Sequence, residues 1–198
     1  MENQRLLVRL AKIFDKLKIP YFITGGIATV IWGRPRFTAD IDIVIQLVAN
    51  KLDQLALALF KIDKDVYLDK SMMAEALRQQ GEFNFIYPRS GLKVDFWILK
   101  NTPIERVRLK RRVAKKIGGR IVYFSSPEDL ILSKLLWYKE THSTRQLEDI
   151  ESVLRISGSK INMRYLKTWA DQLNVLEILD RLLEGGPSDI DDGKTHQK

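Results

Sequence analysis

The sequence predicts an α+β fold, with helices and strands alternating to about residue 125 and a helical part after it. Three observations support this prediction. Short runs of apolar and β-branched residues, bounded by glycine or proline, recur up to residue 124 and are typical of strands. Segments with apolar residues three or four positions apart lie between these runs, as expected of amphipathic helices. From residue 126 onward only the helical pattern remains.

The first elements are a helix, a strand and a glycine turn. Residues 5–18 carry apolar side chains at helical spacing, and Pro20 ends this helix. Residues 21–24 are a short apolar run, which predicts a buried strand. Two glycines at 25–26 then form a tight turn, from which residues 27–32 start a short helix.

The clearest strand covers residues 40–48, where aliphatic residues alternate with others. Because side chains alternate between the two faces of a strand, Asp40 and Asp42 share the face opposite the aliphatic side chains. The other elements expected in the N-terminal part are helices at 51–60, 70–80 and 103–112, a hairpin of strands 83–87 and 92–99, and a hairpin of strands 112–117 and 120–124.

The C-terminal part is predicted to contain helices near 127–140, 144–156, 161–172 and 174–183. Ser126 is suited to cap the first of them, and a proline follows at the favoured first helical position. We therefore expect a domain of residues 1–125 and a helical part of residues 126–183 packed on it, because no flexible linker separates them. The polar tail 184–198 is rich in Gly and Asp and is expected to be disordered.

The composition excludes several kinds of site. The chain has 198 residues, of which 45% are hydrophobic and 29% charged, and these are ordinary globular values. It has no cysteine, so a disulfide scaffold, a thiolate zinc site and a cysteine nucleophile are excluded. A metal would be held by oxygen ligands, which suits Mg²⁺ or Mn²⁺. No targeting segment or membrane span is apparent, so we expect a soluble cytoplasmic protein.

Three aspartates on predicted strands point to metal-dependent chemistry. Asp40 and Asp42 lie about 7 Å apart along one strand face, from a rise of about 3.3 Å per residue, so both can reach one cation. Asp95 lies in a buried-looking strand, where a lone acid needs a partner. The alternative is that these acids are solvated or paired with nearby cations, namely Arg34 or Arg36 for the first two and Lys93 or Arg89 for Asp95.

The glycines at 25–26 add a candidate phosphate site. A turn between a strand and a helix N-terminus lets backbone N–H groups approach a phosphate, although glycines most often only form the turn. Three strand acids behind such a turn form a coherent two-metal site for phosphoryl transfer.

This combination resembles the nucleotidyltransferase superfamily related to DNA polymerase beta. The segments that carry the resemblance are Thr-Gly-Gly-Ile-Ala at 24–28, Arg-Phe-Thr-Ala-Asp-Ile-Asp-Ile-Val-Ile at 36–45 and Val-Asp-Phe at 94–96. The form Gly-Gly…Arg-x-Thr-x-Asp-Ile-Asp resembles the abortive-infection and toxin-type subgroup. The resemblance covers roughly residues 20–155, and it implies a nucleotidyltransferase-like mixed β-sheet flanked by helices.

The resemblance also implies roles for individual residues. Asp40, Asp42 and Asp95 would be the catalytic residues that bind Mg²⁺ or Mn²⁺, and Asp95 would also position or help deprotonate the attacking hydroxyl. Gly26 stands where many relatives have serine, so a hydroxyl contact to the γ-phosphate is missing here. The residues implied to bind the nucleotide are Gly25, Gly26, Arg36, Thr38, Lys134 and Asp149.

Lys134 lies among apolar residues on one face of the helix expected at 127–140. Burying its ammonium is costly unless it finds an anion, and the alternative is that the side chain reaches the surface. The toxin-type subgroup has a lysine here, followed on the next helix by an arginine and an acid, which Arg145 and Asp149 match at i, i+4. The resemblance implies that Lys134 contacts a nucleotide phosphate and that Asp149 orients it or holds part of the substrate.

The excess of positive charge is concentrated in one stretch. The chain has a net charge of +8, and residues 105–120 hold eight Lys or Arg and one Glu. Such a run is either a solvated face or, through residues 106–120, a path for a polynucleotide acceptor such as tRNA.

The sequence therefore predicts a Mg²⁺-dependent nucleotidyltransferase. It would move a nucleoside monophosphate from an NTP, such as ATP, to a hydroxyl on RNA, tRNA, protein or a small molecule. The subgroup adds a toxin-like role with a cognate antitoxin as partner. The alternative is a non-catalytic nucleic-acid-binding or regulatory module on the same fold.

Overall fold

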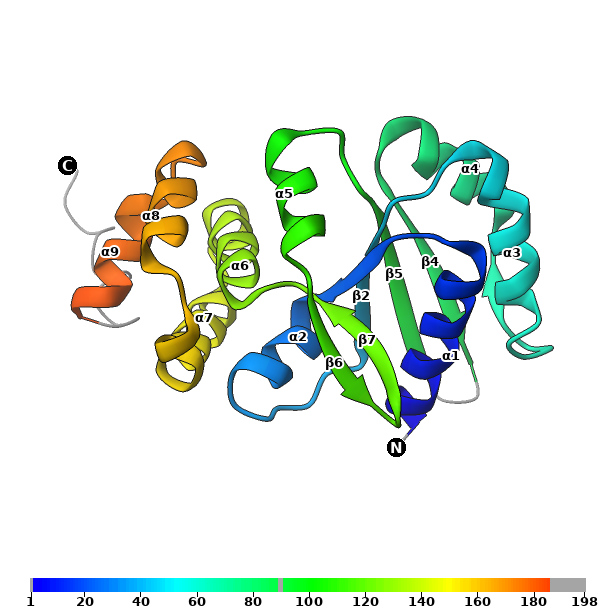
Figure 1. Ribbon diagram of the computed structural model, residues 1–198, viewed down its shortest axis with the longest axis horizontal. Coiled ribbons are helices and arrows are strands. Elements are labelled where there is room, and N and C mark those ends of the chain that lie inside the picture. The colour runs from blue at the N-terminus through cyan, green and yellow to red at the C-terminus, as the bar shows by residue number, and fades with distance from the viewer. Residues whose placement is uncertain (1, 89–90, 186–198) are drawn as a thin grey trace. The chain divides into compact units, whose positions relative to one another are not determined.

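The computed structural model of the chain describes residues 2–88 and 91–185 (Figure 1). The chain folds into two compact units. Of the described residues, the first unit contains those of 2–28 and 37–125, and the second contains those of 29–36 and 126–185. The tail predicted to be disordered lies mostly outside the described residues, since the last described residue is Gly185.

The first unit is built on one mixed β-sheet, which confirms the predicted α+β fold (Figure 1). In the described residues it has seven strands in the order β3-β4-β5-β2-β1-β7-β6. The strands are β1 (Tyr21–Thr24), β2 (Asp40–Ile45), β3 (Tyr67–Leu68), β4 (Glu82–Tyr87), β5 (Leu92–Ile98), β6 (Val113–Ile117) and β7 (Arg120–Phe124). Strand β2 is parallel to β5 and β1 is parallel to β7, while the other neighbours are antiparallel.

In the described part of the chain, the first unit also contains four complete helices and a 3₁₀ turn at Ala49–Lys51. The helices are α1 (Glu2–Leu17), α3 (Leu52–Phe60), α4 (Lys70–Gln79) and α5 (Pro103–Arg111). Two of them begin at side-chain caps that the sequence supplies. Asp69 accepts hydrogen bonds from the Ser71 and Met72 N–H groups of α4, and Thr102 accepts one from the Glu105 N–H of α5. Such caps satisfy N–H groups that have no partner within the helix.

The core of the first unit lies on one face of the sheet. The Phe14 ring of α1 packs against Phe96 of β5 at 6.1 Å between centroids, and Phe96 stacks on Phe83 at 4.9 Å. In β2 the aliphatic residues at 41, 43 and 45 are buried, as their alternation predicts. The opposite face is partly covered by α5, where Leu109 packs with Phe22 and neighbouring apolar residues.

The second unit is helical, as predicted from the pattern after residue 125. It contains α6 (Pro127–Thr141), α7 (Thr144–Ser157), α8 (Met163–Gln172) and α9 (Leu176–Glu184), with a 3₁₀ turn at Gly158–Lys160. Ser126 caps α6 by accepting the Asp129 N–H, which confirms the predicted start. Within the described ranges, no helix combines the length and the apolar character that a membrane crossing requires.

Residues 29–36 belong to the helical unit although they precede the Asp40 strand. Helix α2 (Gly25–Trp32) therefore begins in the first unit and ends in the second. The Trp32 carbonyl accepts a hydrogen bond of 2.6 Å from Ser157, and the Arg34 N–H donates to Ser152 Oγ at 2.7 Å. These two bonds attach the end of α2 to α7.

Candidate active site

A row of polar side chains crosses four strands on the face of the sheet opposite the main core. The strand register pairs Thr24 with Asp42, Asp42 with Asp95, and Asp95 with Asn84. Paired residues on neighbouring strands point to the same side of a sheet, so these four side chains lie next to one another. Asp40 precedes Asp42 on the same face, so the structure places all three predicted acids on one face.

The glycine turn packs directly on this row. Gly25 has φ of +59°, and a Cβ atom built there would overlap Oδ2 of Asp42. At Gly26 a Cβ atom would lie 2.5 Å from Oγ1 of Thr38. A side chain at Gly25 would overlap the Asp42 carboxylate, whereas one at Gly26 would require the Thr38 side chain to move.

Asp42 is held in an environment that opposes its charge. Burial raises the pKa of its carboxyl group, and the nearby carboxylates of Asp95 and Asp40 raise it further. The Gly26 N–H and the Trp97 side chain donate hydrogen bonds that lower it in part. The three neighbouring carboxylates repel one another, and a bound cation would relieve this repulsion.

Asp95 already has two partners. Its side chain is mostly buried, and the Lys93 ammonium lies 2.9 Å from its Oδ1 atom. The Asn84 side-chain amide donates a hydrogen bond to the same oxygen. The bond to Asp95 is also the largest cause of a raised pKa for Lys93. The ion pair with Lys93 that the sequence left open for Asp95 is therefore present, while Arg89 lies outside the described residues.

The donor set fits a hard divalent cation in its chemistry, since it consists of carboxylate oxygens. Among the residues that the structure describes, no three acidic or histidine side chains converge closely enough to form a ready metal site. Asp95 is turned toward Lys93 and Asn84 instead. Metal ligation by Asp40, Asp42 and Asp95 stays a prediction.

The second unit contains a buried cluster of opposite charges. Both Asp149 oxygens bind Arg36, at 2.8 Å from Nε and 2.7 Å from Nη2. The Lys134 ammonium lies 2.7 Å from Oδ2 of Asp149 and 3.1 Å from Oε1 of Gln146. Lys134 and Asp149 are both buried, so the lysine has the anion that its apolar surroundings demand.

Two cations balance the single carboxylate of Asp149. Burial alone would raise the pKa of this carboxyl group, but hydrogen bonds and charge from Arg36 and Lys134 outweigh it and hold the pKa below its usual range. Arg145, which the sequence matched to the subgroup pattern, is exposed and belongs to no such contact in the described residues. Sequence reasoning missed Gln146, which the i, i+3 spacing to Asp149 on α7 could have indicated. It also missed the contact between Arg36 and Asp149, which no local spacing connects.

The basic run is divided among several contacts within the first unit. Arg108 pairs with Glu105 at 2.5 Å, and Arg112 lies 4.7 Å from the Tyr123 ring centroid. Arg120 pairs with Asp15 at 3.0 Å. These arginines are engaged in packing, which leaves exposed lysines such as Lys110 and Lys116 to meet a polyanion.

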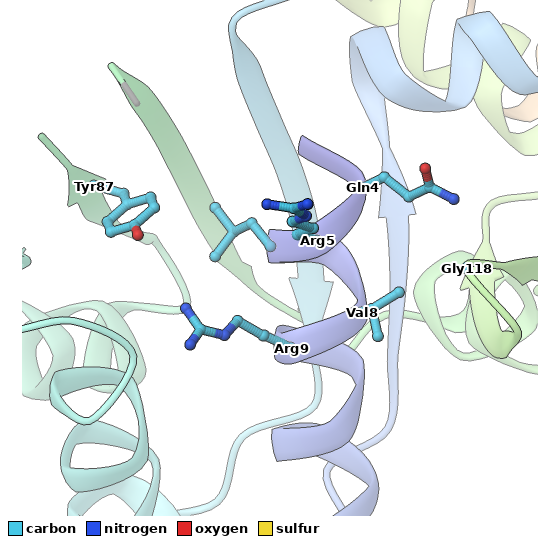
Figure 2. Close-up of a pocket in the computed structure, with 7 residues that line it drawn as sticks. Gln4, Arg5, Val8, Arg9, Tyr87 and Gly118 are labelled. Atoms are coloured by element: carbon cyan, nitrogen blue, oxygen red, sulfur yellow. The ribbon is translucent and has the colours of Figure 1, made fainter. Parts of the chain in front are cut away.

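A separate hollow lies beside α1. Figure 2 shows Arg5 and Arg9 of α1 on the side of Tyr87, with Gln4 and Val8 on the side of Gly118. It contains none of the residues that the sequence assigned to catalysis or nucleotide binding. The predicted site is the polar sheet face and not this hollow.

Solved structures with a similar fold are nucleotidyltransferases or proteins like them. An antigenic nucleotidyltransferase-like protein from Paracoccidioides brasiliensis has a TM-score of 0.53 and 24% identity, covering 77% of this chain and 74% of its own. ANT(2″)-Ia in complex with adenylyl-2″-tobramycin has a TM-score of 0.61 and 14% identity, covering 88% and 99%. A putative nucleotidyltransferase from H. pylori has a TM-score of 0.50 and 17% identity, covering 95% and 85%.

Neither a model of a known protein family nor a curated protein sequence matches the chain. The structural similarity confirms the nucleotidyltransferase-like fold that the Gly-Gly and Asp-x-Asp segments predicted. The toxin-type subgroup stays a prediction.

Proposed function

We propose that this chain, which has the fold of nucleotidyltransferases, transfers a nucleoside monophosphate from an NTP to a hydroxyl acceptor. One observation carries the proposal. Asp42 and Asp95 are paired across β2 and β5, and the Gly25 backbone packs against the Asp42 carboxylate. Acidic ligands and the backbone at a helix start therefore adjoin one another, as catalysis on a triphosphate requires.

Each residue of the first unit has a role in this proposal. The backbone at Gly25 and Gly26 would receive the triphosphate, and Thr38 packs beside it. Asp40, Asp42 and Asp95 would hold Mg²⁺ or Mn²⁺, which neutralises the developing phosphate charge when bound. Asp95 would also orient the acceptor hydroxyl and accept its proton. The hydroxyl oxygen forms the new bond to the α-phosphorus, and pyrophosphate leaves.

The resemblance also assigns the buried cluster of the second unit to nucleotide binding. Asp149 holds Lys134 and Arg36 by hydrogen bonds of 2.7–2.8 Å, so each cation is fixed in position. We assign these cations to phosphate contacts and Asp149 to their orientation.

The acceptor stays open among three chemical classes. A polynucleotide, such as tRNA, would use the exposed lysines of residues 106–120. A small molecule is the second class, and the adenylyl-2″-tobramycin bound to ANT(2″)-Ia is one adenylylated compound of that size. A protein hydroxyl is the third.

The decisive experiment is transfer of label from each of the four NTPs, labelled at the α-phosphate, in cell extract with Mg²⁺ or Mn²⁺. The products are separated into RNA, protein and small molecules. We expect metal-dependent label in one fraction with the wild type, and at most about one hundredth of it with Asp42→Asn. Asp53→Asn is the matched control, because Asp53 forms an exposed pair with Lys70 outside the polar face. If no fraction is labelled under any condition, the proposal is wrong.

A toxin-like role is a finer form of the same proposal and rests on the subgroup resemblance alone. It predicts that expression of the wild type arrests growth, that Asp42→Asn does not, and that a cognate antitoxin relieves the arrest. Equal growth with both proteins at equal expression would remove the toxin-like role and leave the transfer reaction in place.

A further inference from the structure

Lys93 brings a positive charge into the group of acids. Its ammonium lies 2.9 Å from Oδ1 of Asp95, and its backbone is the register partner of Asp40 on β2. It also lies within electrostatic reach of Asp40 and Glu82. The side chain is 45% exposed, so the ammonium stands at the open side of the polar face and not in the core.

Two cations cannot share this face without cost. A divalent ion about 6 Å from an ammonium, in a solvent-exposed setting, is repelled enough to weaken its binding about tenfold. If the lysine instead moves away, the repulsion weakens, but the metal must then displace the ion pair between Lys93 and Asp95. The Lys93 ammonium therefore competes with a divalent cation at these carboxylates.

We propose that Lys93 is the resident counter-ion of Asp95 and Asp40, which keeps divalent-metal affinity low until a nucleotide triphosphate is present. The inference rests on the proposed function in one respect, that these acids form the metal site. A triphosphate brings several negative charges, which offset the lysine and favour the metal. Nucleotide and metal would thus bind with positive coupling, and the coupling would depend on the charge at position 93.

The hydrogen bond from Asn84 makes this proposal testable by substitution. Asn84 donates to the same Asp95 oxygen as Lys93. When the lysine charge is removed, Asp95 keeps one partner, so its side chain stays in place. The half-exposed position of Lys93 likewise predicts that a neutral side chain of similar length leaves the fold intact.

The first measurement is Mn²⁺ binding to the full chain without nucleotide, by calorimetry or by the electron paramagnetic resonance signal of free Mn²⁺. We expect Lys93→Met to bind Mn²⁺ about tenfold more tightly than the wild type, and Lys93→Arg to bind as weakly as the wild type. Lys100→Met is the control, because Lys100 is exposed beyond the end of β5. Equal or weaker binding by Lys93→Met overturns the proposal.

The second measurement adds a non-hydrolysable analogue of each NTP in turn. We expect the best of them to tighten Mn²⁺ binding at least several-fold more in the wild type than in Lys93→Met. An equal gain in both proteins overturns the coupling.

The two proposals fail in different ways. If no protein binds Mn²⁺ even with nucleotide, the metal site itself is wrong and both proposals fall. If Lys93→Met binds Mn²⁺ tightly and yet no label transfer is found with any NTP, only the proposed reaction is wrong.

Discussion

Arg36 and Asp149, which are 113 positions apart in the sequence, form a bidentate ion pair. The pair joins the segment after α2 to the buried face of α7, inside the second unit. The same carboxylate also holds the buried ammonium of Lys134. One acid thus balances two cations, and its loss would leave both without their anion.

We predict that Asp149→Asn destabilises the protein by about 3 kcal/mol, because removing one partner of a buried ion pair leaves an uncompensated charge. Urea unfolding followed by circular dichroism measures the change. Glu148→Gln is the matched control on the same helix, since Glu148 pairs with Arg34 at 3.8 Å in an exposed setting. Exposed pairs contribute less than about 1 kcal/mol, so equal losses for both variants would contradict the role of burial.

The same carboxylate predicts a dependence of stability on pH. The pKa of Asp149 is held below its usual range in the folded state, while in the unfolded chain it is about 3.9. Its contribution is therefore present above that unfolded value and is lost as pH falls through the lower, folded pKa. We expect the gap in unfolding free energy between the wild type and Asp149→Asn to narrow below about pH 4. A gap that stays constant from pH 7 to pH 3 would argue against this assignment.

Substitution of Gly25 is predicted to affect both the stability of the backbone and the activity of the site. Its φ of +59° disfavours any residue with a side chain, and a Cβ atom there would overlap the Asp42 carboxylate. We expect Gly25→Ala to cost about 1 kcal/mol for the backbone alone, and to abolish label transfer by displacing Asp42. Gly119→Ala is the control, because Gly119 has φ of +82° and nothing within 4 Å of the added atom. It should lose similar backbone stability but keep transfer, and loss of transfer in both variants would contradict the argument.

The parts of the site that follow from local patterns were predictable from the sequence. Alternation in β2 places Asp40 and Asp42 on one face, and the glycines at 25–26 mark the turn. The structure agrees on both points. The strand itself ends at Ile45 and not at residue 48, and the Gln46 N–H donates the last hydrogen bond of this ladder, to the Pro20 carbonyl.

Contacts that depend on strand order and on distant segments were not predictable in this way. Asn84 meets Asp95 only because β4 lies beside β5 in one register, which no local spacing encodes. The two-residue strand β3 has too few residues for a pattern. Arg36 pairs with Asp149 through the packing of the segment after α2 on α7, so its partner could not be read from the neighbouring acids in sequence.

The exposed lysines of the basic run provide a test of whether the protein binds a polynucleotide such as tRNA. Lys110 and Lys116 are exposed, whereas Arg112 lies over the Tyr123 ring. If tRNA is bound along this run, we expect the double variant Lys110→Ala with Lys116→Ala to weaken tRNA binding and to reduce the slope of log affinity against log salt by about 2. Arg112→Ala should instead lower the free energy of unfolding by about 1 kcal/mol.

Filter binding across a salt series measures the first effect, with Lys70→Ala as the control for an exposed lysine outside the run. Substitution of Asp40 and Asp42 then distinguishes a nucleotidyltransferase from a non-catalytic nucleic-acid-binding module. Binding that survives Asp40→Asn with Asp42→Asn, in a protein that transfers no label, favours the non-catalytic module. If no tRNA binding is detected even at low salt, a polynucleotide acceptor is excluded. The proposed reaction would then need a protein or a small molecule as its hydroxyl acceptor.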